Sequence, residues 1–422
     1  MATPIINTQL GTLNEHQSNQ VTELGAIGDT LEALNHLISH QNAAIDLLAS
    51  DKKAALATDI GALVELIRSG ELSEVMDYGD QIAMAWADGT TEYSPEMNLC
   101  HFETAELEDG EQIPVADFEW EYILPFGTQF DAPEAIYYFD GTEGAGQKYI
   151  AIKVGYGAGW VSGQNIQINL TDAPAEGDQL VIDCGANNAN NPTSGRTWNV
   201  YAKGSTTSKQ TGTTSNGMSG TKLGETSTNA QATNGRVNAP ARVVYGYNRW
   251  AQSGLRQYLN SAAAAGAWWT AQNNWDRPCD YAATRAGFLS GYDASIVAHF
   301  RPTKVVTVAC DADSNVQDTT YDRVFLASLE QAYITPQFSG VEGAYWEYYK
   351  RLLGRTSPAQ QGQTYARLKK YALNGKTSAQ GRFLRSAYRA DSYSVWFVYS
   401  SGYVSGASAV GGSRCAPCVR IG

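Results

Sequence analysis

The sequence predicts an α+β protein built from an N-terminal helical segment, a β-rich middle region and a C-terminal region of mixed helices and strands. Apolar residues recur at heptad spacing in residues 1–70, which is typical of a coiled coil. Short apolar runs alternate with Gly, Asn and Asp clusters in residues 71–240, which is typical of strands and turns. Residues 241–422 mix both patterns, and a chain of 422 residues is long enough for more than one hydrophobic core.

The N-terminal segment contains an apolar seam made of two series. The first is Leu10, Leu24, Leu31, Ile38 and Ile45, and the second is Leu13, Ile27, Leu34 and Leu48. Gln17, Gln20 and Gln41 fill other seam positions, where polar groups lower the stability of a coiled coil and help fix its register. The seam predicts a segment for oligomerisation or attachment. An amphipathic helix packed against its own domain is the alternative.

A further apolar series, from Leu56 to Ile67, follows the charged residues 51–53 out of phase with the seam. The helix therefore either shifts its seam at this point or folds back as a hairpin. Gly70 is expected to end the helical segment, because glycine is the usual residue just past a helix C-terminus.

The middle region contains strand-length apolar runs at 149–154, 166–170 and 179–182. Aromatic residues are expected to anchor a compact sheet core in this region: Trp86, Trp120, Tyr122, Tyr137 and Tyr138. A run rich in Ser, Thr, Gly and Asn at 204–235 is expected to be a long loop or linker.

The C-terminal region opens with a predicted helix at 253–261, and the apolar content of this helix continues from Ala262 to Trp269. Residues 304–309 predict a strand, and residues 321–330 predict a strand that passes into a helix.

The last forty residues have the composition of a binding surface. Between Ser386 and Ser413, 16 of 28 residues are Tyr, Ser or Gly, and none is Lys or Glu. Tyr supplies large and fairly rigid contact area, while Ser and Gly supply adaptable hydrogen bonding and space. Val395, Trp396 and Val404 supply apolar anchors, so packed strands are expected here and not a disordered tail.

The frame R-S-A-x-R-A-x-S-x-x-V-W-x-V-x-S-S-G-x-V begins at Arg385, and R-C-A-P follows at Arg414. Together they resemble the variable C-terminus of proteins altered by diversity-generating retroelements, a group that includes phage major tropism determinants. In that family an error-prone reverse transcriptase alters template adenines, so that asparagine codons become a scatter of residue types. The family displays the variable residues on a C-type-lectin-type fold, also called the formylglycine-generating-enzyme type, and the resemblance implies this fold for residues 241–422. The motifs at 248–261 and 321–330 also resemble this group, whereas residues 1–240 do not.

The resemblance assigns a ligand-binding role to the variable positions of region 385–414. These are Tyr388, Asp391, Tyr393, Ser394, Phe397, Tyr399, Tyr403, Ser405, Gly406, Ala407, Ser408, Val410 and Gly411. The framework positions that it implies are Arg385, Ser386, Trp396, Gly402, Arg414 and Pro417. We expect most variable residues to be solvent-accessible on one side of the domain, with Trp396 and Arg385 buried. A position that accepts Tyr, Gly or Asp without unfolding cannot lie in a close-packed core.

The function that the resemblance implies is that of a phage or prophage receptor-binding protein, of the tail-fibre kind, that determines host tropism. Its implied partners are a host cell-surface receptor, either protein or glycan, other phage tail or virion proteins, and two further copies of itself in a homotrimer. A virion decoration or a cell-surface display protein that uses the same variable positions is the alternative binding function.

Charge and hydropathy limit the classes of partner that are expected. The 43 acidic and 30 basic residues give a net charge of −13, which repels phosphate backbones and anionic lipids, so we expect no nucleic-acid partner. The sequence has no run of about 18 apolar residues and no N-terminal signal-peptide pattern. We therefore expect that the protein does not insert into a membrane. We expect it to be made in the bacterial cytoplasm without an export signal and then to be assembled into the virion.

Neither a cofactor nor a metal is expected. The six cysteines are too few for a disulfide-stapled scaffold, and the C-A-P-C spacing of Cys415 and Cys418 has no second pair to complete a zinc site. Asp311 and Asp313 lack the Gly and the terminal Glu of a calcium-binding EF-hand loop, so a polar turn is preferred. Nucleophile and metalloprotease motifs are missing from the sequence, so binding without catalysis is expected, and an oxidase of the formylglycine-generating type is the weaker alternative.

Overall fold

The computed structural model describes residues 3–56, 59–134, 136–139, 141, 144–145, 148–152, 165–182, 197–213, 215–216, 245–273 and 276–422. Helices and strands are mixed, with a helical N-terminal segment and a β-rich remainder, as the sequence predicts. The chain divides into two compact units, Met1–Asp59 and Ile60–Gly422. These two units differ from the three-part division predicted from the sequence, which has boundaries at 70 and 240.

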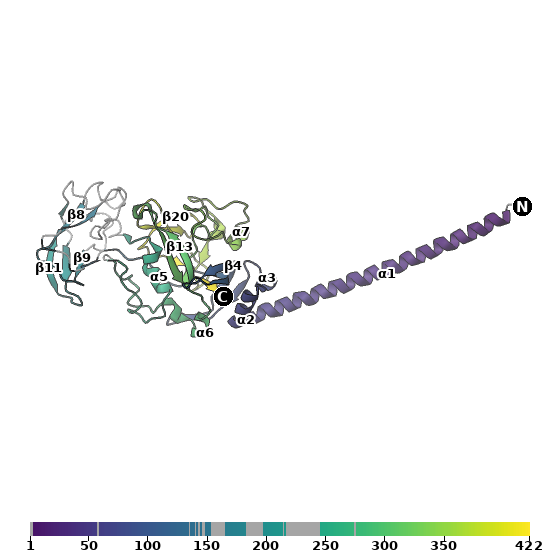
Figure 1. The fold of residues 1–422 in the computed structure, drawn as a ribbon, viewed down its shortest axis with the longest axis horizontal. Coiled ribbons are helices and arrows are strands. Elements are labelled where there is room, and N and C mark those ends of the chain that lie inside the picture. The colour runs from purple at the N-terminus through teal and green to yellow at the C-terminus, as the bar shows by residue number, and fades with distance from the viewer. Residues whose placement is uncertain are drawn as a thin grey trace. The chain divides into compact units, whose positions relative to one another are not determined.

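The first unit is one long helix, α1 (Thr3–Leu56), which runs through residues 51–53 without a break (Figure 1). The seam residues between positions 8 and 39 are exposed, including Leu24 at 67% and Leu31 at 56%. Between positions 8 and 39, the seam residues of this helix are therefore not covered by other apolar residues of their own unit. None of the helices in the described part of the chain combines the length and apolar character needed to span a membrane.

The second unit begins with two short helices, α2 (Ile60–Ser69) and α3 (Leu72–Val75). Leu63, Val64 and Ile67 are buried on one side of α2, which packs against strand β5 (Gln112–Trp120). Gly70 ends α2 in the left-handed conformation, with φ +76°, as expected. The apolar series around Ile67 therefore belongs to the core of the second unit and not to the seam.

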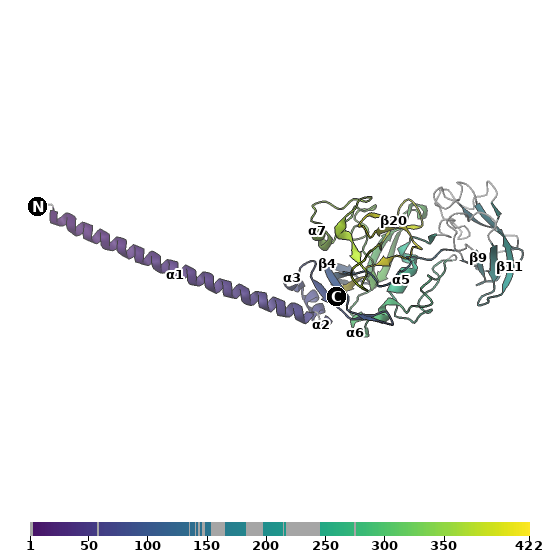
Figure 2. The ribbon, with the colours of Figure 1, turned by 180° about the vertical axis from the view of Figure 1, so that it is seen from behind.

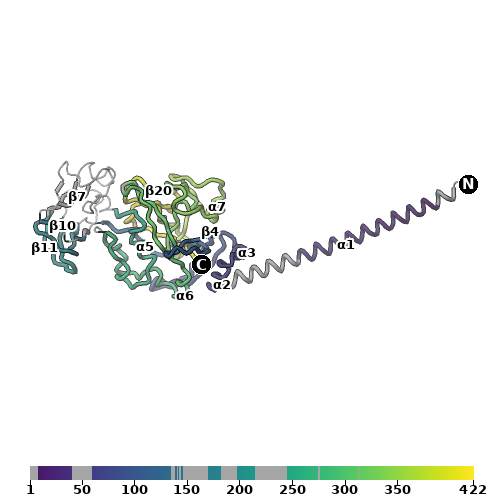
Figure 3. Tube along the Cα trace, viewed as in Figure 1, coloured from purple at the N-terminus to yellow at the C-terminus, as the bar shows by residue number. Residues whose placement is uncertain are grey.

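A five-stranded sheet with the order β1-β4-β5-β22-β15 forms the centre of the second unit. Its remaining strands are β1 (Gln81–Ala83), β4 (Glu96–Glu106), β15 (Val324–Phe325) and β22 (Cys418–Ile421). The C-terminal strand β22 pairs antiparallel with β5 on one side and with β15 on the other. Figures 1, 2 and 3 show the C-terminus in the same part of the unit as β4, and β5 lies between β4 and β22 in the sheet.

The core beside this sheet also joins residues from both sides of position 240. Trp86, in the hairpin of β2 (Trp86–Ala87) and β3 (Glu92–Tyr93), lies 5.2 Å from Trp120 between ring centroids. Both indole rings contact Phe288, with centroids 5.4 Å away in each case. Trp86 and Trp120 are core anchors as predicted, but the core is shared with the C-terminal region and is not that of a separate middle domain.

Two smaller sheets contain the other strands of the middle region. One has the order β11-β10-β9-β6, from β6 (Ile136–Tyr138), β9 (Gln179–Ile182), β10 (Thr197–Tyr201) and β11 (Ser208–Thr213). The other has the order β12-β8-β7, from β7 (Lys148–Ile152), β8 (Asn165–Asn169) and β12 (Ser215–Asn216). The strands predicted at 149–154, 166–170 and 179–182 correspond to β7, β8 and β9, while residues 153 and 154 lie outside the described residues. The predicted loop at 204–235 is wrong for β11 and β12, and its residues 217–235 lie outside the described residues.

The C-terminal region starts with the turn η2 (Trp250–Gln252) and the helix α5 (Gly254–Leu259). Ser253 caps α5, because its hydroxyl accepts a hydrogen bond from the Arg256 amide at 3.2 Å. The helix predicted at 253–261 is confirmed, and it does not continue into Ala262–Trp269. The remaining short helices are η3 (Phe288–Gly291), α6 (Ala294–Val297), η4 (Asp311–Asp313), α7 (Glu347–Leu353) and η5 (Ala366–Leu368).

Strand β13 (Thr303–Val308) confirms the strand predicted at 304–309 and pairs with β14 (Gln317–Asp322). The helix predicted to follow this hairpin does not form. After β15, residues 328–334 instead make a turn in which the Ser328 hydroxyl accepts from the Gln331 amide at 3.0 Å. This bond has the N-cap geometry that normally starts a helix, but the turn ends at Tyr333, whose φ of +54° lies in the left-handed region.

The last sheet has the order β20-β19-β18-β21. Its strands are β18 (Arg382–Ala387), β19 (Ser394–Val398), β20 (Val404–Ser408) and β21 (Arg414–Cys415). The pairing of β18 with β21 is parallel and the other pairings are antiparallel. A small pair, β16 (Lys370–Tyr371) and β17 (Ala379–Gln380), precedes it. The predicted packing of the Tyr-, Ser- and Gly-rich segment as strands is thus confirmed.

Candidate binding face

The predicted ligand-binding positions lie on one β-hairpin, residues 388–411, which we call the binding hairpin. Its strands β19 and β20 pair antiparallel, with Ser394 opposite Ser408 and Phe397 opposite Ser405. Strand β18 pairs with β19 and attaches the hairpin to the rest of the unit. The fold thus gathers these positions into a single supersecondary element.

The positions do not all share one face of this hairpin. Successive residues of a strand face opposite sides of a sheet. Ser405 shares a face with Phe397, whereas Gly406 shares the opposite face with Trp396. Because residues 405–408 are consecutive, the pleat of β20 divides the predicted positions between both faces of the hairpin.

Two tyrosines are the exposed aromatic residues of the hairpin, Tyr399 at 37% and Tyr403 at 38%. The half-buried positions are Tyr388, Asp391, Tyr393, Ser394, Ser405, Gly406, Ala407, Ser408, Val410 and Gly411. Phe397 is only 3% exposed, and its ring packs on Phe383 with centroids 5.2 Å apart. The prediction that Phe397 is accessible is therefore wrong, and this ring belongs to the core.

Tyr399 and Tyr403 form an aromatic pair at the end of the hairpin. Their ring centroids are 5.9 Å apart, and the Tyr399 ring also contacts Phe397 edge-to-face at 4.9 Å. The Tyr399 hydroxyl donates to the Gly406 carbonyl at 3.0 Å, and partial burial raises the pKa of this hydroxyl. The contact with Phe397 and the hydrogen bond to Gly406 therefore fix the Tyr399 ring, while the outer surface of the pair remains in contact with solvent.

The turn between the two strands depends on Gly402, a predicted framework residue. Its φ of +85° lies in the left-handed region, and a Cβ there would collide with the Tyr365 carbonyl. The Gly402 carbonyl accepts from the Tyr365 amide at 2.9 Å, and the Val404 amide donates to the Gln363 carbonyl at 3.0 Å. The turn that presents the two tyrosines is thus fixed against the segment 362–365.

The opposite end of the hairpin is held by Asn248, which is fully buried. Its side-chain amide donates to the carbonyls of Tyr388, Asp391 and Ser394 at 3.2, 2.8 and 2.8 Å. The Asp391 carboxylate accepts from the Ser394 amide at 2.6 Å and from the Tyr393 amide at 3.1 Å. Burial raises the pKa of Asp391 although these hydrogen bonds favour its charged form. The predicted ligand-binding side chain of Asp391 is therefore engaged in shaping its own loop.

Tyr245 supports the same end of the hairpin and was not singled out by the sequence analysis. Its ring stacks on Tyr393 at a centroid distance of 5.1 Å. Its carbonyl accepts from the Ser408 hydroxyl at 3.2 Å and from the Val410 amide at 3.1 Å. Three of the predicted positions are thus in contact with one residue outside the hairpin.

The framework arginine Arg385 is 2% exposed, and Trp396 is 3% exposed, so both are buried as predicted. The Arg385 guanidinium donates to the Leu326 carbonyl at 2.6 Å and also to Gln331 and to the carbonyl of Glu342. Burial lowers the pKa of Arg385 to about 10, and the Glu342 carboxylate acts in the opposite direction. The framework position Ser386 places its hydroxyl between the Leu329 amide and the Glu342 carboxylate.

The other framework positions connect the hairpin to the central sheet. Arg414 donates to the Leu124 carbonyl at 2.7 Å, and the Pro417 carbonyl accepts from the Trp120 amide at 3.0 Å. Arg382, at the start of β18, forms an ion pair with Glu119 of β5 at 3.1 Å. Glu119 is fully buried and also pairs with Lys370 at 3.1 Å.

Glu119, Glu342 and Tyr245 are structural supports that sequence reasoning missed, and Asn248 was noted only as part of the motif at 248–261. Arg382 and Glu119 stand 263 residues apart, so no local pattern joins them. One usable signal was present: Arg382 and Arg385 lie within an otherwise apolar strand segment, and a buried arginine requires an acidic or carbonyl partner.

Cysteine and acidic residues give no further site within the described residues. Cys100, Cys279, Cys310, Cys415 and Cys418 are buried, and burial raises the pKa of four of their thiols, Cys100, Cys279, Cys415 and Cys418. Cys184 lies outside the described residues. Asp311 and Asp313 stand in the short turn η4, as the polar-turn interpretation predicts. The described residues contain no group of three or more His, Cys, Asp or Glu side chains placed to hold a metal ion.

Residues 229–421 match the model of a domain family described as a domain of unknown function, DUF6273. No curated protein and no solved structure matches the chain. The matched range includes the binding hairpin, its support Asn248 and the central strand β22. It does not include Glu119 or the rest of β5.

Proposed function

We propose that the protein is a receptor-binding protein of a phage or prophage that attaches to host-surface ligands through the binding hairpin. In this proposal residues 241–422 provide a C-type-lectin-type framework, and a diversity-generating retroelement alters the variable positions other than the buried Phe397. The protein binds without making or breaking bonds. It acts as part of the virion, where α1 joins copies of the chain and attaches them to other tail or virion proteins.

The observation that carries the proposal is that different residues of the hairpin hold its backbone in place and expose side chains to solvent. Support comes from backbone pairing, from Gly402 and from the buried residues Asn248 and Arg385. Display comes from Tyr399 and Tyr403, which are more than one-third exposed at the hairpin end. Backbone hydrogen bonds do not depend on side-chain identity, so exposed positions of this kind tolerate exchange without loss of the fold.

Adsorption measurements on single substitutions test the proposal. Buried aromatic residues at interface centres commonly contribute ~2 kcal/mol or more when truncated. We therefore expect Tyr399→Ala and Tyr403→Ala each to weaken adsorption of purified protein to host cells by about thirtyfold, following that free energy. Ser405→Ala, which removes one small hydroxyl from the same hairpin, is the matched control and should change adsorption only slightly.

Adsorption that survives both tyrosine substitutions but is lost in Ser405→Ala would contradict this assignment. The proposed diversification by a retroelement is tested separately, by sequencing the genome around the gene. We expect a near-copy of the 3′ end that carries adenines at the variable positions, beside a reverse transcriptase gene. A 3′ end that stays invariant in deep sequencing of a propagated phage population would exclude active diversification.

A further inference from the structure

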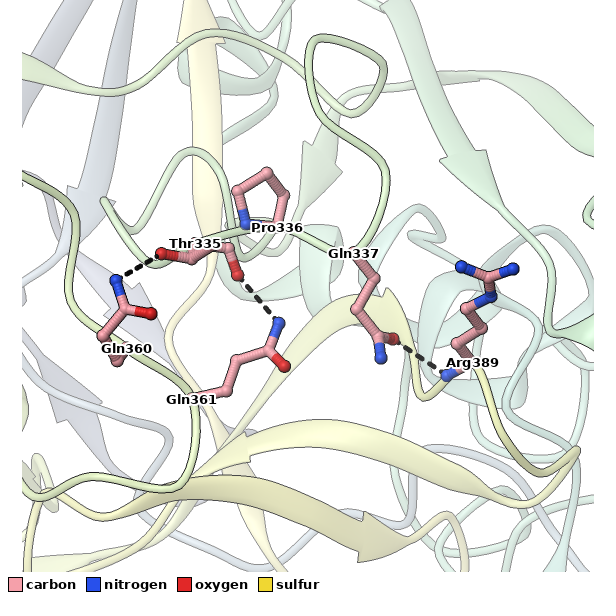
Figure 4. Close-up of a pocket in the computed structure, with 6 residues that line it drawn as sticks. All are labelled: Thr335, Pro336, Gln337, Gln360, Gln361 and Arg389. Atoms are coloured by element: carbon pink, nitrogen blue, oxygen red, sulfur yellow. Dashed lines mark hydrogen bonds between the residues drawn. The ribbon is translucent and has the colours of Figure 1, made fainter.

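An open cavity of about 340 Å³ lies next to the binding hairpin, lined by Thr335, Pro336, Gln337, Gln360, Gln361 and Arg389. Figure 4 shows these side chains around the cavity. The volume falls within the roughly 300–1,000 Å³ range of small-molecule pockets. The lining has no Asp or Glu and presents amide, hydroxyl and guanidinium groups.

The walls of the cavity are built by backbone pairing. The Thr335 amide donates to the Ala359 carbonyl at 2.8 Å, and the Ala359 amide donates to the Tyr333 carbonyl at 2.9 Å. The Gln360 amide donates to the Tyr365 hydroxyl at 2.7 Å. These contacts fix the segments that carry the two glutamines before any ligand arrives.

Several polar atoms of the lining make no hydrogen bond to another described residue. Gln361 Nε2 donates to the Thr335 carbonyl at 2.8 Å, and Gln360 Nε2 donates to the Thr335 hydroxyl at 2.9 Å. Gln337 Oε1 accepts from the Arg389 amide at 2.9 Å. The Oε1 atoms of Gln360 and Gln361, the Nε2 atom of Gln337 and the Nη atoms of Arg389 make no hydrogen bond to another described residue. The cavity therefore offers both acceptors and donors to a ligand.

The cavity is continuous with the binding hairpin at two points. Gln337 Oε1 also accepts from the Trp396 indole at 2.9 Å, and the Tyr388 ring packs on Trp396 at 5.0 Å. On the other side, the Gly362 amide donates to the Val404 carbonyl at 2.8 Å. Arg389 lies between the variable positions 388 and 391. The cavity is therefore linked to the variable ring of Tyr388 through the framework residue Trp396.

The chemistry of the lining indicates which ligand fits. The Arg389 guanidinium pairs with Asp311 at 2.8 Å and lies over the Phe338 ring at 5.3 Å from its centroid, so its charge is largely balanced. Paired amides and a balanced guanidinium can donate to and accept from neighbouring hydroxyls. A hydroxyl-rich ring uses both kinds of group at once, whereas a bare anion uses only the donors.

We infer that this cavity is a sugar-binding subsite, built from framework residues, which takes one monosaccharide unit of the host-surface ligand. The inference rests on the proposed function. It adds a constant contact to the variable ones: the cavity anchors a common sugar, and the variable side chains select its surroundings. Gln337 positions the subsite by holding both Trp396 and Arg389, while Gln360, Gln361 and Arg389 contact the sugar.

Saturation-transfer NMR on the full chain, titrated with single sugars, tests the subsite directly. The probes are glucose, galactose, mannose, N-acetylglucosamine and glucuronic acid, so that neutral and acidic sugars are separate arms. We expect at least one of them to bind with an affinity in the millimolar range. Gln361→Ala and Arg389→Ala should each weaken that binding at least about tenfold, because each removes hydrogen bonds to the sugar. Gln363→Ala is the matched control, since this exposed glutamine is two positions away and does not line the cavity.

Two results overturn the inference. One is that none of the five sugars binds, and the other is that binding occurs with equal strength in Gln361→Ala, Arg389→Ala and the wild type. Adsorption of the wild-type protein to host cells, measured on the same sample, separates the two proposals. Adsorption without sugar binding removes the subsite and leaves the proposed function standing. The subsite is supported if the Arg389→Ala variant loses the saturation-transfer NMR signal of the bound sugar while its thermal unfolding midpoint stays unchanged.

Discussion

Asn248 is the residue on which one end of the binding hairpin depends, because a single buried amide donates to three carbonyls of the loop 388–394. No other side chain in the described residues bonds all three. Asn248 is fully buried, and its removal takes this donor from the Tyr388 and Asp391 carbonyls, whereas the Ser394 carbonyl still accepts from the Tyr388 amide at 2.9 Å.

We expect Asn248→Ala to lower the free energy of unfolding by about 2–4 kcal/mol, since each buried group left unsatisfied costs ~1–3 kcal/mol. Calorimetric unfolding of the full chain measures the loss. Asn374→Ala is the control, because Asn374 is exposed and substitutions at such positions usually stay within about 0.5 kcal/mol. Equal unfolding midpoints for the two variants would show that the loop does not need the Asn248 amide.

Glu103 provides a residue-scale test of pH dependence. Burial and then the Asp117 charge raise its pKa to about 7, while Arg420 and Arg385 act in the opposite direction. Between pH 4.5 and about 7 the folded protein holds a proton that the unfolded chain releases, so stability falls as pH rises through this interval.

The Glu103→Gln variant mimics the protonated side chain and does not titrate. We expect its thermal midpoint, taken relative to that of the wild type, to rise between pH 5 and about pH 8. The sign is fixed by the raised pKa, since only the wild type loses stability from this group over that interval. Midpoints that keep a constant difference across the pH series would contradict the raised pKa of Glu103.

Helix α1 is the element whose sequence pattern was the clearest guide. Its heptad seam predicted a helix, and the structure confirms one from Thr3 to Leu56. The seam leucines are exposed on the single chain, including Leu24 at 67%. Exposed leucines at heptad spacing are stabilised when they pack against the same seam of another copy. Association through α1 remains a prediction, and the trimeric state rests on the resemblance to the variable proteins.

We expect light scattering to show three copies in the full chain and one copy in the double variant Leu24→Glu/Leu31→Glu. A charge at two seam positions prevents burial of the seam, because an unpaired buried carboxylate costs several kcal/mol. Glu23→Gln on the same helix lies outside both apolar series and is the control that should leave association unchanged. A monomeric wild type would refute association through the seam.

In the binding hairpin, the strands could be predicted from the sequence, but the strand register and the long-range contacts could not. The strand character and the buried positions of Trp396 and Arg385 could be predicted from the resemblance and the apolar anchors. The division of residues 405–408 between two faces followed from the pleat, but it required the register of β19 with β20. The engagement of Asp391 with its own loop depended on Asn248, which is 143 residues away in the sequence. Contacts of this separation leave no mark in a local pattern.

At the scale of the whole molecule, residues 81–120 and the C-terminal strand form one sheet, so the second unit cannot be cut at position 240. Strand β22 takes its hydrogen-bond partner on one side from β5. Two buried arginines, Arg382 and Arg420, take their carboxylate partners Glu119 and Asp117 from the same strand. The matched family range begins at residue 229 and so lacks these partners.

We therefore expect a chain of residues 241–422 to be unfolded or aggregated, and a chain of residues 60–422 to fold. Removing one partner of a buried ion pair typically costs ~3–5 kcal/mol, and the shorter chain loses the partners of two arginines at once. Dispersion of amide signals in NMR distinguishes the outcomes. A well-dispersed spectrum from 241–422 alone would mean that the C-terminal region is an independent domain after all.

The position of β22 also determines when folding can finish during synthesis. Arg420 and its partner Asp117 are 303 residues apart, so β5 emerges from the ribosome long before the strand that pairs with it. At synthesis rates of about 5–20 residues per second, that delay is roughly 15–60 s. During this time β5 lacks its β22 partner, and an unpaired strand edge of that kind promotes aggregation. Strand β22, which pairs with β5 across this long separation, thus joins the central sheet late in synthesis.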